Sequence, residues 1–126
     1  MTQNHLGYIL LQQNKNLEEA FELIVSAYNP NAADGTVTDS LGWAFYKTGN
    51  YEQAVRYLEK ASDQAPSEAV IYDHLGDAYW QVGRTREAAF QWNHALGLKD
   101  DTGEFNRQAT LKKLENGLEK TGFAGL

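Results

Sequence analysis

Two consecutive blocks of this chain, residues 35–68 and 69–102, repeat one 34-residue pattern. Aligned without a gap, they carry the same residue at Asp39/Asp73, Leu41/Leu75, Gly42/Gly76, Ala44/Ala78, Gly49/Gly83, Ala54/Ala88 and Ala61/Ala95. The aromatic positions also match in type, as Phe45/Tyr79 and Tyr46/Trp80. A fixed period of this length is typical of stacked supersecondary units, each of which covers its apolar face with the next unit. The repeat therefore predicts a solenoid rather than one closed core.

The spacing of the apolar residues within each block is helical. Each block contains two apolar stripes, separated at Gly49 in the first block and at Gly83 in the second. Glycine is the residue that most readily ends a helix in the left-handed conformation, so we predict two helices per block with a turn at each glycine. Asn50 and, further upstream, Asn16 are predicted to cap the helices that follow them.

A divergent copy of the pattern covers about residues 1–34, and a last helix follows the repeats. In the divergent copy, Gly7 and Ala20 correspond to Gly42 and Ala54, with one extra residue in the turn. Residues 104–120 have a helical pattern that no longer matches the repeat. We therefore predict one all-α domain, a right-handed superhelix of three units (about 1–34, 35–68 and 69–102), closed by a capping helix over about 104–120.

Composition excludes several classes of protein. The net charge is −6, with 11 basic and 17 acidic residues, which disfavours binding to nucleic acid or to anionic membrane surfaces. The absence of cysteine removes disulfides and thiolate chemistry, and leaves cytoplasm and periplasm equally open. No run of residues approaches the length of a membrane span, and the first residues lack the features of an export signal.

Each block has Leu-Gly, an aromatic residue three positions later, and then Ala, a large apolar residue and Ala, followed in the first block by Pro. This pattern resembles the tetratricopeptide repeat. In the first block these residues are Leu41, Gly42, Phe45, Ala54, Leu58, Ala61 and Pro66. The second block has Leu75, Gly76, Tyr79, Ala88, Trp92 and Ala95 at the equivalent positions, with Asp100 in place of Pro66 and the aromatic Tyr72 where the first block has Thr38. The sequence of the repeats is similar to that of C-terminal segments of longer bacterial proteins of this family. The resemblance implies close packing at Gly42 and Gly76, and a concave surface lined by the first helix of each pair.

In such proteins the concave surface holds partner segments, so the resemblance implies a non-catalytic interaction scaffold. The residues that map to this surface are Asn4, His5, Tyr8, Gln12, Asp39, Ser40, Trp43, Tyr46, Lys47, Asp73, His74, Asp77, Trp80 and Gln81. We take Tyr8, Asp39, Trp43, Tyr46, Lys47, Asp73, His74, Asp77 and Trp80 as the candidate partner-binding residues. Carboxylates at these positions would repel an acidic C-terminus, so we expect a basic or aromatic protein segment instead.

Other interpretations of the same residues stay open. Asp73, His74 and Asp77 share a helix face and could hold a divalent cation, or Asp73 could favour the helix dipole while His74 lies at the surface. Acidic residues on exposed helix faces are also commonly just solvated. No phosphate-binding glycine loop, nucleophile elbow or metal-binding helix motif is present, so we predict no enzymatic activity and no cofactor.

A second hypothesis makes the chain a structural part of a longer solenoid, or a module that pairs with itself. The predicted first helix contains Leu6, Tyr8, Ile9, Leu10 and Leu11 and is apolar on more than one side. In a longer solenoid an earlier helix would cover that apolar surface. Here the first helix is expected to pair with another copy of the chain, to expose a sticky edge, or to fray.

Overall fold

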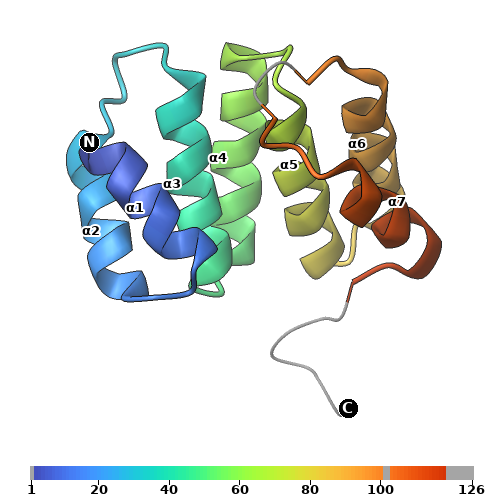
Figure 1. Ribbon diagram of the computed structural model, residues 1–126, viewed down its shortest axis with the longest axis horizontal. Helices are drawn as coiled ribbons and strands as arrows, with labels where there is room; N and C mark the ends of the chain where they lie inside the picture. The colour runs from blue at the N-terminus through green and yellow to red at the C-terminus, as the bar shows by residue number, and fades with distance from the viewer. Residues whose placement is uncertain (1, 101–102, 119–126) are drawn as a thin grey trace.

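The computed structural model describes residues 2–100 and 103–118, and over these residues its regular elements are all helices. They are α1 (Gln3–Gln12), α2 (Leu17–Ala27), α3 (Gly35–Lys47), α4 (Tyr51–Gln64), α5 (Ala69–Gln81), α6 (Thr85–Gly97) and α7 (Arg107–Asn116). The described helices pair as three antiparallel hairpins, α1 with α2, α3 with α4 and α5 with α6, which stand side by side in a row that α7 ends (Figure 1). The predicted all-α solenoid is confirmed.

Glycine ends the first helix of the second and third hairpins. Gly49 and Gly83 both have a φ of +86°, a left-handed conformation that an L side chain rarely adopts. The prediction of turns at these residues is confirmed. Asn16 and Asn50 lie at the predicted N-cap positions of α2 and α4, but neither makes a side-chain cap hydrogen bond. Asn16 instead lies in the left-handed region, with a φ of 47°, and starts α2 through its backbone carbonyl.

Small residues let the two helices of each hairpin approach closely. A Cβ atom at Gly42 would lie 2.7 Å from Cγ of Leu58, and one at Gly76 would lie 2.4 Å from Nε1 of Trp92. Ala54 and Ala88 are completely buried on the opposing helices. Real Cβ contacts are longer than these distances, so the glycines are required where α3 crosses α4 and where α5 crosses α6.

The core runs along the row instead of closing at one centre. One cluster of buried residues joins α1, α2 and α3 around Leu11, Ile24 and Leu41. A second cluster joins α4, α5 and α6 around Leu58, Leu75 and Trp92. Each hairpin thus buries its apolar face against its neighbours, as expected for a repeat architecture.

The last helix, α7, is shorter than predicted. It begins at Arg107, after Asn106, whose side chain accepts a hydrogen bond from the Ala109 N–H at 3.0 Å. It ends at Asn116, and the predicted residues 119 and 120, with the tail beyond them, lie outside the described residues. One 34-residue period after Asp73 falls on Arg107, so α7 stands where a further repeat would place its first helix.

Candidate interaction surface

The first helices α1, α3 and α5 form the surface on which the candidate residues were expected. Asp39 and Trp43 on α3, and His74 and Asp77 on α5, are all at least nine-tenths buried. The interpretation of His74 as a surface residue was therefore wrong. Tyr8, Tyr46, Lys47 and Trp80 are half-buried at the same surface. Only part of the candidate set is thus directly accessible to a partner.

His74 is enclosed by an acid and an indole from the preceding first helix. Its Nδ1 lies 2.9 Å from Oδ1 of Asp39, and its ring stacks on Trp43 with the ring centroids 3.9 Å apart. Burial alone would lower the pKa of His74, but the neighbouring carboxylate of Asp39 outweighs burial and raises the pKa above its ordinary value. The imidazole therefore joins α3 to α5 by a buried hydrogen bond, and Asp39 favours its protonated form.

Two acids of α5 converge on one lysine of α7. The Lys113 ammonium donates to Asp73 Oδ1 at 3.0 Å and to Asp77 Oδ2 at 3.1 Å. Thr110 also donates to Asp73 Oδ1, at 2.7 Å. Burial raises the pKa of Asp77 to about 6, even though Lys113 acts in the opposite direction. Two carboxylates and one ammonium share a poorly hydrated space, so one negative charge is left uncompensated there when both acids are ionised.

The equivalent acids of the two repeats do the same structural work. Asp39 and Asp73 occupy the same repeat position, and each accepts a hydrogen bond from the first helix of the next unit. His74 supplies the donor in one case, and Thr110 with Lys113 in the other. The repeated acid is thus a link between successive units, which accounts for its burial.

Trp43 has little free surface. Tyr46 stacks on it with the ring centroids 4.5 Å apart, and His74 stacks on it as well. Its indole N–H donates to Oε1 of Gln12 on α1 at 2.9 Å, and the Lys47 ammonium lies 5.5 Å from its ring centroid. Trp43 therefore ties α1, α3 and α5 together, and the expected stacking face for a partner is already used within the chain.

Trp80 lies against the segment that follows α7. Its indole N–H donates to the Leu118 carbonyl at 2.6 Å. A Cβ atom at Gly117 would come within 2.4 Å of the Trp80 ring, so this glycine is held flat against the indole. The aromatic residue predicted to meet a partner thus contacts the C-terminal segment of the same chain.

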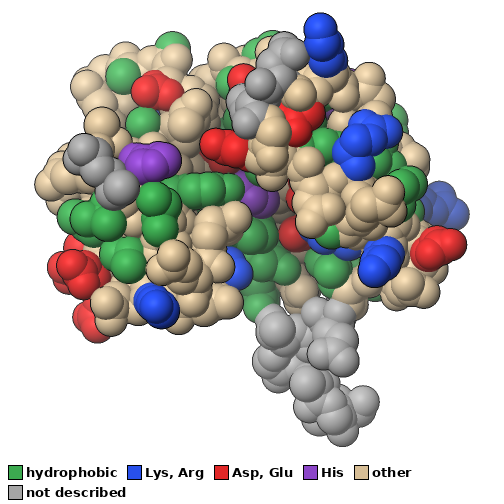
Figure 2. Space-filling model, viewed as in Figure 1, with side chains coloured by type: hydrophobic (Ala, Val, Ile, Leu, Met, Phe, Trp, Pro, Cys, Tyr) green, Lys and Arg blue, Asp and Glu red, His purple; other side chains and the backbone are tan. Residues whose placement is uncertain are grey.

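A small cavity lies between α1, α3 and α5, close to Asp39. Its volume is about 160 Å³, and its lining includes Tyr8, Glu68 and Glu104. The Asn4 Oδ1 atom, also in the lining, is buried and has no hydrogen-bond partner in the part of the chain that the structure describes. Burial raises the pKa of Tyr8, with Asp39 acting in the same direction, so its phenol stays protonated. Figure 2 shows this face of the molecule, with acidic and hydrophobic side chains gathered at the hollow in its centre.

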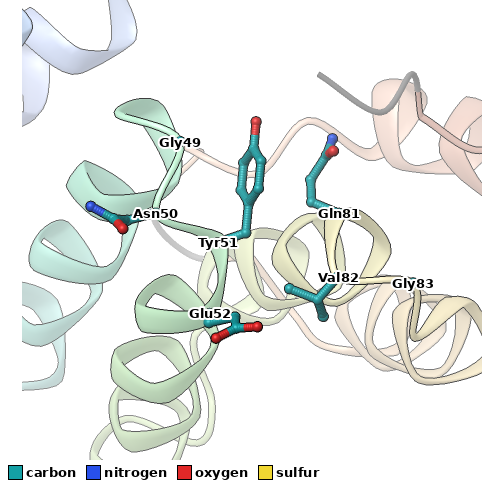
Figure 3. A pocket seen from close by; sticks show the side chains of 7 residues that line it. All are labelled: Gly49, Asn50, Tyr51, Glu52, Gln81, Val82 and Gly83. Atoms are coloured by element: carbon teal, nitrogen blue, oxygen red, sulfur yellow. The ribbon is translucent and has the colours of Figure 1, made fainter. Parts of the chain in front are cut away.

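A second, more open depression lies where the turns meet, at the far end of α5. It measures about 660 Å³ and is lined by Gly49, Asn50, Tyr51, Glu52, Gln81, Val82 and Gly83 (Figure 3). Tyr51 and Gln81 point the same way from its two sides. Most of the lining is turn backbone and short side chains, so the depression offers little chemistry of its own.

Asp73, His74 and Asp77, the three residues of the metal hypothesis, do not point to one common centre. His74 bonds Asp39, while Asp73 and Asp77 face Lys113. Among the described residues no group of three or more potential ligands is placed to hold a metal ion. In the same residues, no helix has both the length and the apolar character needed to cross a membrane.

Sequence reasoning missed Lys113 and Thr110, the partners of the α5 acids. Both lie in the helix that was treated only as an end cap. The signal was the repeat itself, because one period after α5 places α7 beside it in the row of first helices. Treating residues 107–116 as the first helix of a further unit would have predicted that this helix contacts Asp73.

Comparison with known proteins agrees with this geometry. The sequence model of the family described as TPR repeat matches residues 42–83. The TPR repeat-containing protein PA4667 of Pseudomonas aeruginosa is 41% identical over 58 residues, which are 46% of this chain and 10% of that protein. Residues 42–83 match the tetratricopeptide repeat family. It corresponds to about a tenth of the length of the curated relative that it matches.

A solved structure shares the arrangement of helices over most of this chain. The type III secretion translocator chaperone SycD of Yersinia enterocolitica superposes with a TM-score of 0.74 and 19% sequence identity. The match covers 90% of this chain and 85% of that chain. At this level of identity the similarity establishes a shared arrangement of helices, and it does not extend the chaperone's activity to this chain.

Proposed function

We propose that this tetratricopeptide protein is a non-catalytic scaffold that binds a basic, aromatic-containing protein segment along α1, α3 and α5. The observation that carries the proposal is the cavity of about 160 Å³ between these helices, with Asp39, Glu68 and Glu104 in its lining. A lysine or arginine side chain of a partner fits this volume and charge, and the unpartnered Asn4 Oδ1 offers it an acceptor.

The candidate residues have two different roles in this proposal. Tyr8, Tyr46, Lys47 and Trp80 reach the surface, where they contact the partner directly. Asp39, Trp43, His74 and Asp77 lie behind them and hold the helices at their spacing. Asp73, whose side chain is 13% exposed, lies at the border between the two groups. The attraction for a cation comes from Glu68 and Glu104 in the cavity lining, because Asp39 is already paired with His74 and Asp77 with Lys113.

Fluorescence anisotropy tests the proposal with two labelled peptides of equal length. One contains alternating Lys and Trp residues, and the other replaces each Lys with Glu. We expect the basic peptide alone to bind, and Glu68→Gln to weaken binding severalfold. Glu19 is an exposed acid on α2, a second helix, so Glu19→Gln is the matched control with the same change in charge. A preference for the acidic peptide, or equal effects of the two substitutions, would refute the proposal.

A second candidate function is self-association through the end of the row formed by α1 and α2. Leu6 on α1 and Val25 on α2 are 38% and 46% exposed, although both are large and apolar. Apolar side chains on an end helix are typical of a surface that another unit covers. Sedimentation equilibrium checks this candidate, which requires a dimer that Leu6→Ser converts to monomer. A monomer at all concentrations would exclude it.

A further inference from the structure

Helix α7 lies on α5 in the manner of a bound ligand. Its Lys113 contacts both Asp73 and Asp77, and Thr110 contacts Asp73. Leu114, which follows Lys113 in the sequence, packs against the apolar cluster of α4 to α6. The contacts have a simple order along the helix: a hydroxyl, then a lysine three residues later, then a leucine. Residues three and four apart share one helix face, so a single face of α7 makes all of them.

This attachment is mainly polar. Thr110 is the single residue of α7 that is fully buried, and Leu111 on the same helix is 45% exposed. The helix has ten residues, near the lower limit at which a helix is stable without packing. By contrast, α5 is enclosed by α4 on one side and α6 on the other. Helix α7 also packs beside α6, but among the described helices it is the one without a buried apolar residue.

We propose that the surface of α5 formed by Asp73, Asp77 and Trp80 is a docking site for a partner helix, which α7 fills within the chain when the partner is absent. The partner helix is basic and amphipathic, with a hydroxyl residue three positions before a lysine and a leucine directly after it. The inference rests on the proposed function, and it identifies one position on the first-helix surface and the chemistry that this position accepts.

Charge complementarity supports a basic occupant. The site presents two carboxylates, and α7 answers them with one ammonium. Both carboxylates lie within 3.0 Å of the same Lys113 ammonium, so one positive charge is shared between two acids. A partner helix that brings two cationic side chains would satisfy the pair better than α7 does. The exchange thus has an electrostatic driving force.

Release of α7 also changes the neighbouring cavity. Glu104, in the segment just before α7, contributes to the lining of the cavity between α1, α3 and α5. A movement of α7 that carries this segment along would open the cavity toward α5. The cavity and the site under α7 would then form one continuous surface along three first helices, long enough for an extended or helical partner.

The test uses a fluorescent peptide with the sequence of residues 107–118 as the probe for the full-length protein. Lys113→Ala removes the internal contact with the two acids, so we expect it to bind the probe at least about tenfold more tightly than the unsubstituted protein does. Lys112 is its exposed neighbour on the same helix, and Lys112→Ala is the matched control with the same loss of charge. A probe with Ala in place of its Lys113-equivalent residue should not bind to any of the proteins.

Amide hydrogen exchange over residues 107–116 supplies a second measurement. We expect exchange in α7 to become faster in Lys113→Ala, and faster still when the probe is added in excess, because the probe takes the site on α5 that α7 would otherwise fill. Thr110→Val is a milder substitution that removes the hydroxyl contact with Asp73. It replaces Lys113→Ala in the test if circular dichroism shows that Lys113→Ala does not fold. It should strengthen binding of the probe by a smaller factor.

Three results would overturn the inference. The first is equal affinity of the Lys113→Ala and Lys112→Ala variants for the probe. The second is faster exchange of α7 with no binding of the probe, and the third is unchanged exchange of α7 in both loosened variants. The proposed function has its own readout, the Glu68-dependent binding of the Lys and Trp peptide. If that binding persists while the probe fails, the inference about α7 fails alone.

Discussion

The imidazole of His74 on α5 lies almost parallel to the indole of Trp43 on α3, at an interplanar angle of 15° with ring centroids 3.9 Å apart. Asp39 approaches the same imidazole from the side, with its Oδ1 2.9 Å from Nδ1. The imidazole is therefore held by a carboxylate and an aromatic face at once, both from the preceding repeat, and both contacts favour its protonated form.

This arrangement predicts how stability depends on pH. The pKa of His74 is raised in the folded state, so the folded protein holds a proton that the unfolded chain releases near pH 6.5. The stabilisation is complete below about pH 6.5 and is lost as the pH rises through the folded pKa. Thermal unfolding followed from pH 6 to 9 should show a falling melting temperature.

Two substitutions identify the source of the pH dependence. His74→Gln keeps a hydrogen-bond donor for Asp39 but does not titrate, so it should flatten the curve above about pH 6.5. His94 is exposed on α6, and His94→Gln should leave the curve unchanged. Asp77 adds a separate loss of stability as the pH rises from about 4 to 6, because its pKa in the folded protein, about 6, lies above its ordinary value. A curve for His74→Gln that matches the unsubstituted protein would contradict the assignment.

The contact between Gly76 and Trp92 predicts a large effect from one methyl group. An added Cβ atom would lie 2.4 Å from Nε1 of Trp92, whose ring is 1% exposed and unable to move aside. We expect Gly76→Ala to destabilise the protein by about 1–3 kcal/mol through overpacking. Urea unfolding measures this change. Gly97, near the end of α6, has no atom within 4 Å of its added Cβ, so Gly97→Ala should be neutral or slightly stabilising.

The hydrogen bond from Trp92 to Asp77 separates two contributions of this acid. Asp77 Oδ1 accepts from Trp92 Nε1 at 3.0 Å, and the same carboxylate faces Lys113. Asp77→Asn keeps an acceptor for the indole, whereas Asp77→Ala leaves the indole N–H unpaired. We expect the alanine variant to be less stable than the asparagine variant by about 1–3 kcal/mol, measured by urea unfolding. Equal stabilities would show that the indole hydrogen bond contributes nothing.

Ala54 provides a test of the register of α4 against α3. It is completely buried, so Ala54→Leu should cost about 1–3 kcal/mol and lower the melting temperature. The preceding residue, Gln53, is exposed, and Gln53→Leu adds a side chain of the same size to the surface. Calorimetry should show a clear loss of stability for the first variant alone. An unchanged transition in Ala54→Leu would mean that α4 packs in a different rotation.

The sequence was sufficient to predict the packing of the repeats but not the environment of their charged residues. Gly42, Gly76 and Ala54 have one physical role, close approach, and their spacing reveals it. Asp39 and Asp77 each admit two roles, because a carboxylate on a helix face is either exposed or paired with a buried donor. The donors His74 and Lys113 lie 35 and 36 residues further on. Residues this far apart in the chain are not expected to touch on local spacing alone. The 34-residue period accounts for both contacts once α7 is treated as the first helix of a further repeat.

The link between Asp39 and His74 has a consequence for the length of the protein. Duplication of residues 69–102 would put a second histidine 35 positions after Asp73, the same separation as between Asp39 and His74. The inserted unit would thus bring the histidine that contacts Asp73, and Lys113 of α7 would still contact the acids of the final copy. A chain built in this way can be lengthened one module at a time, without redesign of either end.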